Sequence, residues 1–203
     1  WDEAEAFTQH DVQELLRVLF DALEAELKET PQAETLRQLY VGELCDYVQC
    51  RGCLTESASP SAFEDLNLAI RSFGVQPTLY ASLDEALAAF LEPELLDGAN
   101  QYHCERCAAS GPVQGQVGHP HPPLTRCAAP RDAFKGIKLR RLPRVLTIGL
   151  KRFDFDLSTL TRVKLHHRVA IPRRLDVAQY LAGGAVARQH SQKRKQMGGG
   201  TPG

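Results

Sequence analysis

Apolar residues recur at a spacing of three and four near the start of the chain, which is the spacing of one face of an α-helix. We therefore predict a helix there, ended by Pro31, with Thr8 as its N-cap and Asp11 in capping-box position. Two acidic residues, Asp11 and Glu14, fall together beside the apolar stripe, where they complement the positive end of the helix dipole. On this pattern alone they belong to a solvated helix face. The residues of the stripe are Val12, Leu15, Leu16, Leu19, Leu23 and Leu27.

Further along the chain the pattern changes to the alternation of half-buried strands. Residues 44–48 and 63–70 predict two strands, and residues 145–155 predict the best strand of the chain. A weaker strand is expected at 169–171, and Ser82 opens a capping box that predicts a short helix. The order of these elements predicts an α+β domain with an antiparallel sheet.

Two stretches have the composition of chain without regular structure. Residues 108–130 are rich in Gly, Pro and small residues, so we expect a disordered loop there. From residue 183 onward the sequence is Gly-rich and basic, and we expect a disordered tail over 183–203. The predicted domain therefore covers residues 1–182.

Two Cys-x-x-Cys pairs are the strongest chemical signal of the sequence. Cys50 and Cys53 form the first pair, and Cys104 and Cys107 form the second. Each pair places two thiols on one tight turn, and four thiols are the ligand set of a closed, structural zinc site. The long separation of the pairs indicates an extension clipped within a larger domain. The alternative is four buried cysteines without metal, but cysteine pairs at this spacing are rarely a feature of packing alone.

Composition narrows the class of protein. The 203 residues are 43% hydrophobic, which is enough for a sizeable core, and the formal net charge is -1. Such a balance argues against a dedicated nucleic-acid or membrane binder. Paired cysteines without a visible export signal favour a reducing compartment, so we expect the cytoplasm, with the nucleus as a second location.

Five segments in order resemble the ubiquitin-specific proteases, also called ubiquitin carboxyl-terminal hydrolases. Each is close to a motif of that family, and the resemblance extends from residue 4 to residue 181. The first is the helix box, Gln-His-Asp-Val-Gln-Glu-Leu, at residues 9–15. The others lie at residues 39–42 with 47–53, at 63–68, at 96–107, and at 142–154.

The resemblance implies a papain-like hand of palm, thumb and fingers, of which this chain is part, with antiparallel zinc-ribbon fingers. It implies ubiquitin and ubiquitinated proteins as partners, and hydrolysis of the isopeptide bond at the ubiquitin C-terminus by a cysteine thiolate with a histidine base. In the family, acids of the helix box meet the arginine-rich ubiquitin tail, and Asp11 and Glu14 match those positions. Cys50, Cys53, Cys104 and Cys107 match its zinc ligands, which makes zinc the expected cofactor.

The family's catalytic cysteine and histidine boxes are not found in the 203 residues. We therefore expect no catalytic residue in this chain and no activity of the chain alone. Two functions stay open: part of a deubiquitinating protease, or a non-catalytic ubiquitin-binding or scaffold protein with a structural zinc ribbon. A zinc-ribbon nucleic-acid binder is disfavoured because the two Cys-x-x-Cys turns, here called knuckles, lack interleaved basic and aromatic residues.

Overall fold

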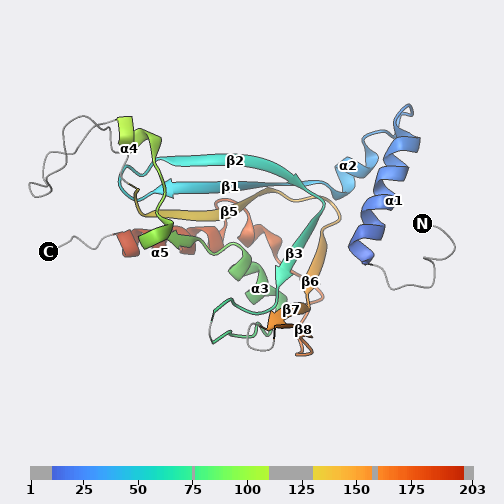
Figure 1. Cartoon of the computed structure of the whole chain (residues 1–203). Helices are drawn as coiled ribbons and strands as arrows, with labels where there is room; N and C mark the ends of the chain where they lie inside the picture. Colours follow the sequence, from blue (N-terminus) through green and yellow to red (C-terminus); the bar gives the residue numbers. More distant parts are fainter. Residues whose placement is uncertain (1–10, 75, 110–129, 157–159, 199–203) are drawn as a thin grey trace, which may run out of the picture.

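The computed structural model describes residues 11–74, 76–109, 130–156 and 160–198 (Figure 1). Helices and strands are largely grouped along the chain, with two helices first and runs of consecutive strands after them, as expected of an α+β domain. The helices are α1 (Val12–Leu27), α2 (Thr35–Tyr40), α3 (Leu83–Phe90), α4 (Glu105–Ala109) and α5 (Ala185–Gly198), with short 3-10 turns η2 (Gly98–Asn100) and η3 (Val177–Tyr180). The strands are β1 (Gly42–Cys50), β2 (Glu56–Phe63), β3 (Asp65–Ala69), β4 (Glu94–Leu96), β5 (Ala133–Arg141), β6 (Thr147–Lys151), β7 (Phe153–Asp156) and β8 (Thr161–Lys164).

The main sheet is antiparallel and has the strand order β2-β1-β5-β4. It forms a long ribbon with α4 at one end and α1 and α2 at the other (Figure 1). Strand β1 confirms the strand predicted at 44–48. Strand β2 was not predicted, because seven of its eight residues are exposed and most are small or polar. It lies at the edge of the sheet. A proline cannot donate a ladder hydrogen bond, so Pro60 is tolerated here because one side of an edge strand has no neighbouring strand to pair with.

A second sheet pairs β3 with β6 in parallel and holds the hydrophobic core. Leu66 and Leu68 of β3 are almost fully buried, as is Ile70 just beyond the strand, so the alternation predicted over 63–70 is confirmed. Helix α3 packs on this sheet and begins at Ser82, whose side chain accepts a hydrogen bond from the Glu85 backbone amide. The predicted capping box and its helix are therefore present.

The strand predicted over 145–155 is broken in two. Between β6 and β7 lies Arg152, whose guanidinium donates to the backbone carbonyls of Leu165 (3.2 Å) and His167 (3.0 Å). Strand β7 then leaves the core sheet and pairs with β8. The weaker strand predicted at 169–171 is wrong, because Ala170 makes only an isolated bridge to Ser82. Both differences arise from partners that are distant in sequence.

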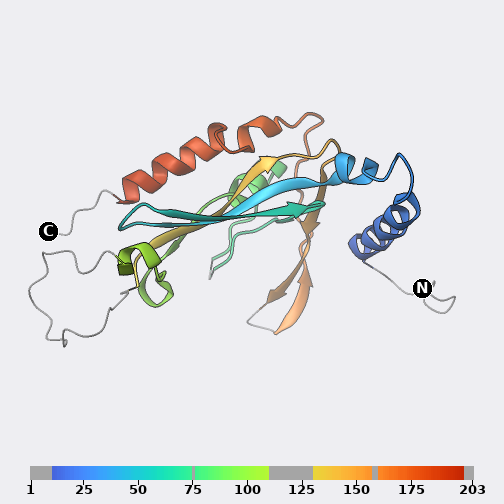
Figure 2. The ribbon, with the colours of Figure 1, turned by 90° about the horizontal axis from the view of Figure 1, so that it is seen from above.

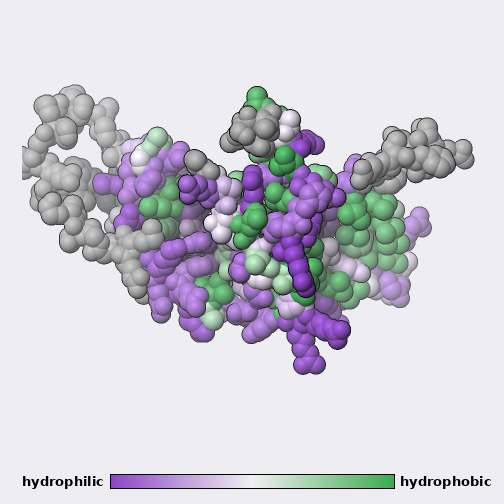
Figure 3. Space-filling model, turned by 90° about the horizontal axis from the view of Figure 1, so that it is seen from below, coloured by the Kyte–Doolittle hydropathy of each residue, from purple (hydrophilic) through white to green (hydrophobic). Residues whose placement is uncertain are grey.

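Helix α1 is present, but its start and its packing differ from the prediction. The helix begins at Val12 and Asp11 is itself the N-cap, with Oδ1 accepting a hydrogen bond from the Gln13 backbone amide at 2.8 Å. Thr8 lies outside the described residues. Phe20 is the residue of α1 that is buried, and its ring lies 4.7 Å from that of Tyr40. Most of the apolar stripe is exposed and gathers on one face over α1 (Figure 3): Val12, Leu15, Leu19 and Leu23.

The prediction of a disordered tail is wrong for residues 185–198, which form helix α5. The helix lies along the main sheet (Figure 2). Its sequence is rich in Ala, Arg, Gln and Lys, which are strong helix formers, and it contains no proline. Gly183 adopts a positive φ of 88° and reverses the chain before the helix, and Val186 packs against the core. The loop predicted at 108–130 lies almost entirely outside the described residues, apart from the end of α4.

Candidate metal centre and the start of helix α1

The four thiols predicted as metal ligands lie together at one end of the main sheet. Cys50 is the last residue of β1, and Cys53 follows it in the turn toward β2. Cys104 directly precedes α4, and Cys107 lies within it. Strand β5 joins the two knuckles, since Ala133 pairs with Cys50 while the nearby Arg131 pairs with Tyr102. The register of the sheet therefore decides that the knuckles meet.

The distances between the sulfurs suit a single tetrahedral metal ion. The Sγ atoms of Cys50 and Cys107 are 3.7 Å apart, and those of Cys53 and Cys104 are 3.5 Å apart. All four lie within 4.8 Å of one another. A zinc ion with Zn–S bonds of about 2.3 Å in a tetrahedron separates its sulfurs by about 3.8 Å. A disulfide would need about 2.05 Å, so these cysteines are free thiols.

Electrostatics at the cluster also fit a cation. The hydrogen bond with the Thr55 hydroxyl, 3.3 Å away, lowers the pKa of Cys53 to about 6, which makes one thiolate available at neutral pH. The hydrogen bond with Cys53 raises the pKa of Cys107 to about 12, and burial raises the pKa of Cys50. Four thiolates so close together need a positive ion among them, and a bound metal would displace the remaining protons.

Neighbouring polar residues hold the knuckles in place. The Arg51 guanidinium pairs with the Asp132 carboxylate at 3.1 Å, and the Gln101 side-chain amide donates to the other carboxylate oxygen at 2.8 Å. Asp132 therefore links the first knuckle to the chain that leads into the second. Arg106 donates to the Thr55 hydroxyl at 3.2 Å, which ties α4 to the turn of Cys53. This network could not be predicted, because nothing in the spacing of these residues along the chain marks them as neighbours.

Two further cysteines stand apart from the cluster or from the described chain. Cys45 is buried in β1 but does not belong to the four-thiol group. Cys127 lies outside the described residues.

The acidic residues Asp11 and Glu14 lie at the opposite end of the main sheet from the thiols (Figure 1). Both are exposed. The first turn of α1 is fixed to the core sheet by a hydrogen bond from the Gln13 side-chain amide to Asn67 on β3. Gly149 on β6 makes room for this contact, because a Cβ there would overlap both side chains. No local pattern marks Gln13, Asn67 and Gly149 as neighbours, yet together they anchor the helix start while Asp11 and Glu14 remain exposed.

None of the helices in the described part of the chain combines the length and the apolar composition needed to cross a bilayer.

Comparisons with known proteins agree with the motifs. A family model described as ubiquitin carboxyl-terminal hydrolase matches residues 1–195. Over 181 residues the chain is 46% identical to ubiquitin carboxyl-terminal hydrolase 47 of Xenopus tropicalis and 44% identical to that of Homo sapiens. It is 33% identical over 181 residues to ubiquitin carboxyl-terminal hydrolase 15 of Saccharomyces cerevisiae. In each case the match covers 89% of this chain but only 12% of the relative.

Proposed function

The chain belongs to the ubiquitin carboxyl-terminal hydrolase family, and from this premise we propose that it is part of the catalytic domain of a deubiquitinating cysteine protease. The whole enzyme would hydrolyse isopeptide bonds at the C-terminus of ubiquitin, with ubiquitin and ubiquitinated proteins as its partners. Residues 1–182 would supply the fingers and part of the palm and thumb of a papain-like hand. The observation that carries this proposal is the antiparallel sheet with four converging thiols at one end and an acidic helix start at the other.

We propose that Cys50, Cys53, Cys104 and Cys107 bind one structural zinc ion. Four protein ligands leave no open position for a substrate or a water, so the metal would hold the knuckles together and take no part in hydrolysis. In this role the zinc would stabilise the end of the sheet by joining the two cysteine pairs.

The 203 residues contain no Asn-x-Gly-x-x-Cys or Gly-His-Tyr box of the family, so we expect the chain alone not to cleave ubiquitin conjugates. Cysteine proteases need both the nucleophile and its base. The measurement is the release of fluorophore from a C-terminal ubiquitin derivative, with an intact family member as the positive control. Turnover by the purified chain, insensitive to removal of contaminating proteases, would contradict this expectation.

The same sample can test ubiquitin binding. Binding without turnover supports a ubiquitin-facing surface and is shared with the alternative of a non-catalytic ubiquitin-binding or scaffold protein. The two functions differ in the intact protein, where only the protease carries a catalytic cysteine and histidine. No measurable binding of ubiquitin to the intact protein would exclude both.

We propose that Asp11 and Glu14 bind the arginines of the ubiquitin tail. Glu14→Gln in the intact enzyme should weaken ubiquitin binding by roughly 1.5–3 kcal/mol, the contribution of one charge-assisted hydrogen bond, toward the lower end because Glu14 is exposed. The loss should shrink as the salt concentration rises. Calorimetric titration at two salt concentrations would measure both effects.

The N-cap role of Asp11 calls for a different substitution. Asp11→Asn keeps a good capping oxygen while removing the charge, so binding should fall with little change in stability. Asp11→Ala should in addition cost about 1 kcal/mol of stability. Glu24→Gln, an exposed acid farther along α1, is the matched control and should bind as the unaltered protein does. Equal binding by Glu14→Gln and Glu24→Gln would show that Glu14 belongs to a solvated helix face and does not bind ubiquitin.

A further inference from the structure

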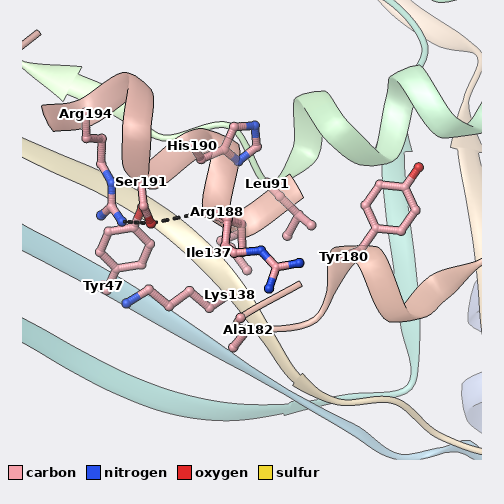
Figure 4. Close-up of a pocket in the computed structure, with 12 residues that line it drawn as sticks. Tyr47, Leu91, Ile137, Lys138, Tyr180, Ala182, Arg188, His190, Ser191 and Arg194 are labelled. Carbon is pink, nitrogen blue, oxygen red and sulfur yellow. Dashed lines mark hydrogen bonds between the residues drawn. The ribbon is translucent and has the colours of Figure 1, made fainter. Parts of the chain in front are cut away.

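A cavity of about 220 Å³ lies between helix α5 and the main sheet (Figure 4). Its floor is the ring of Tyr47, which lies across Gly136 on the neighbouring strand, where a Cβ would be 2.9 Å from the tyrosine hydroxyl. Part of its wall is apolar and comes from Leu91, Ile137 and Ala187. The cavity exists only because residues 185–198 fold as a helix against the sheet.

Three cationic side chains line this cavity: Lys138, Arg188 and Arg194. Two of them sit over the same aromatic ring, with Lys138 Nζ 4.3 Å and the Arg194 guanidinium carbon 5.2 Å from the Tyr47 centroid. Cations on one ring repel each other, and the attraction of each to the ring offsets only part of this repulsion.

The carboxylates nearby do not balance these charges. Glu56 forms an ion pair with Lys138, and Glu92 is paired with Lys193, which does not line the cavity. One carboxylate against three cations leaves an excess of two positive charges. Tyr180 also lines the cavity, but Figure 4 shows its hydroxyl pointing away from Lys138 and Arg194. This hydroxyl donates to the Asp84 carboxylate at 2.8 Å.

The two arginines retain unused donors. Arg194 donates to the neutral oxygens of Gln49 (3.3 Å) and Ser191 (3.0 Å), while its Nε is buried and has no partner among the described residues. The Arg188 guanidinium has no ion-pair or hydrogen-bond partner among the described side chains that line the cavity. Burial lowers the pKa of His190, so this histidine adds no charge at neutral pH. The buried Arg194 Nε is costly without an acceptor, and an anion would satisfy it. Arg188 is exposed, so its donors face water and are available to the same anion.

We propose that this cavity binds a phosphate monoester, with the phosphate dianion between Arg188, Arg194 and Lys138 and the organic group against the apolar wall. A dianion matches the excess of two charges, and the planar guanidinium fork suits phosphate oxygens. The combination of an apolar wall with a few convergent polar groups is typical of small-molecule sites. The lining shares no residue with the thiol cluster or the acidic helix start, so the proposal does not depend on the proposed protease function.

The test is calorimetric titration of the chain with phenyl phosphate and with inorganic phosphate, each against sodium chloride of equal ionic strength. Both anions should bind and compete with each other, and phenyl phosphate should bind more tightly because its ring covers apolar wall. Amide chemical shifts of α5 and β5 should move on binding. Absence of saturable binding by both anions at millimolar concentration would overturn the proposal.

Variants locate the binding. Arg188→Gln should weaken phenyl phosphate binding about tenfold or more, as expected for the loss of one charged hydrogen bond. Arg188→Lys should recover part of the affinity, because it restores the charge without the fork. Arg174→Gln, the same change at an exposed site away from the cavity, should bind like the unaltered chain. Equal weakening by Arg188→Gln and Arg174→Gln would show attraction by overall charge only and would overturn the site.

Discussion

Replacing Cys50 with serine should abolish zinc retention and unfold the thiol end of the main sheet. Cys50 is fully buried at the end of β1, and its sulfur lies 3.7 Å from that of Cys107. A hydroxyl is a poor substitute for a thiolate ligand, and structural zinc binding contributes on the order of 10–16 kcal/mol in small finger peptides. Elemental analysis of the reduced, purified chain should give one zinc per chain before the substitution and none after it.

The matched control for this substitution is Cys45→Ser. Cys45 is also buried in β1, but it stands outside the four-thiol group. The Cys45→Ser chain should keep its zinc and lose only the packing of one sulfur. A chelator should reproduce the effect of Cys50→Ser on the unaltered chain and change the Cys50→Ser chain little. A Cys50→Ser chain that still binds one zinc, or an unaltered chain without zinc, would contradict the proposed site.

Leu68→Ala should destabilise the chain by about 2–5 kcal/mol. Leu68 has no exposed surface and lies in β3, paired in register with Leu150 of β6 and packed in the core cluster with α3. Truncation removes buried apolar surface and leaves a cavity in the core between β3 and α3. The free energy of unfolding, measured by urea titration with saturating zinc, should fall by that amount.

Ile171→Ala is the control for the core substitution. Ile171 is 68% exposed, so its truncation should change the free energy of unfolding by less than about 0.5 kcal/mol. Both variants should retain one zinc, since the core lies away from the thiols. Similar destabilisation by the two variants would show that Leu68 is not in the core.

Local sequence patterns determined the elements that carry their own signal. Ser82 and the helix that follows it, the strand around Cys45, and the alternation of Leu66, Leu68 and Ile70 were all predicted, because capping and periodicity depend on residues close in sequence. The spacing of the four thiols also predicted that they form one group, and the motifs were sufficient to indicate the family. These features need no knowledge of which segments meet.

Local patterns were misleading where a partner from elsewhere in the chain decides. Strand β2 has almost no hydrophobic alternation and exists because its backbone pairs with β1. The segment at 145–155 reads as one strand, yet Arg152 binds carbonyls more than ten residues away and divides it. Helix α5 was hidden in a basic, Gly-ended stretch, and its position on the sheet creates the cationic cavity.

The sequence by itself therefore determined the family, the four cysteines that the fold brings together and the elements with strong local periodicity. Only the tertiary structure decided that β5 brings the knuckles together, that Gln13 and Asn67 fix the acidic helix start, and that Arg188 faces a cavity. The physical reason is that ladder pairing and side-chain contacts across the fold depend on residues far apart along the chain. The pattern within a window of ten or twenty residues therefore cannot predict these contacts.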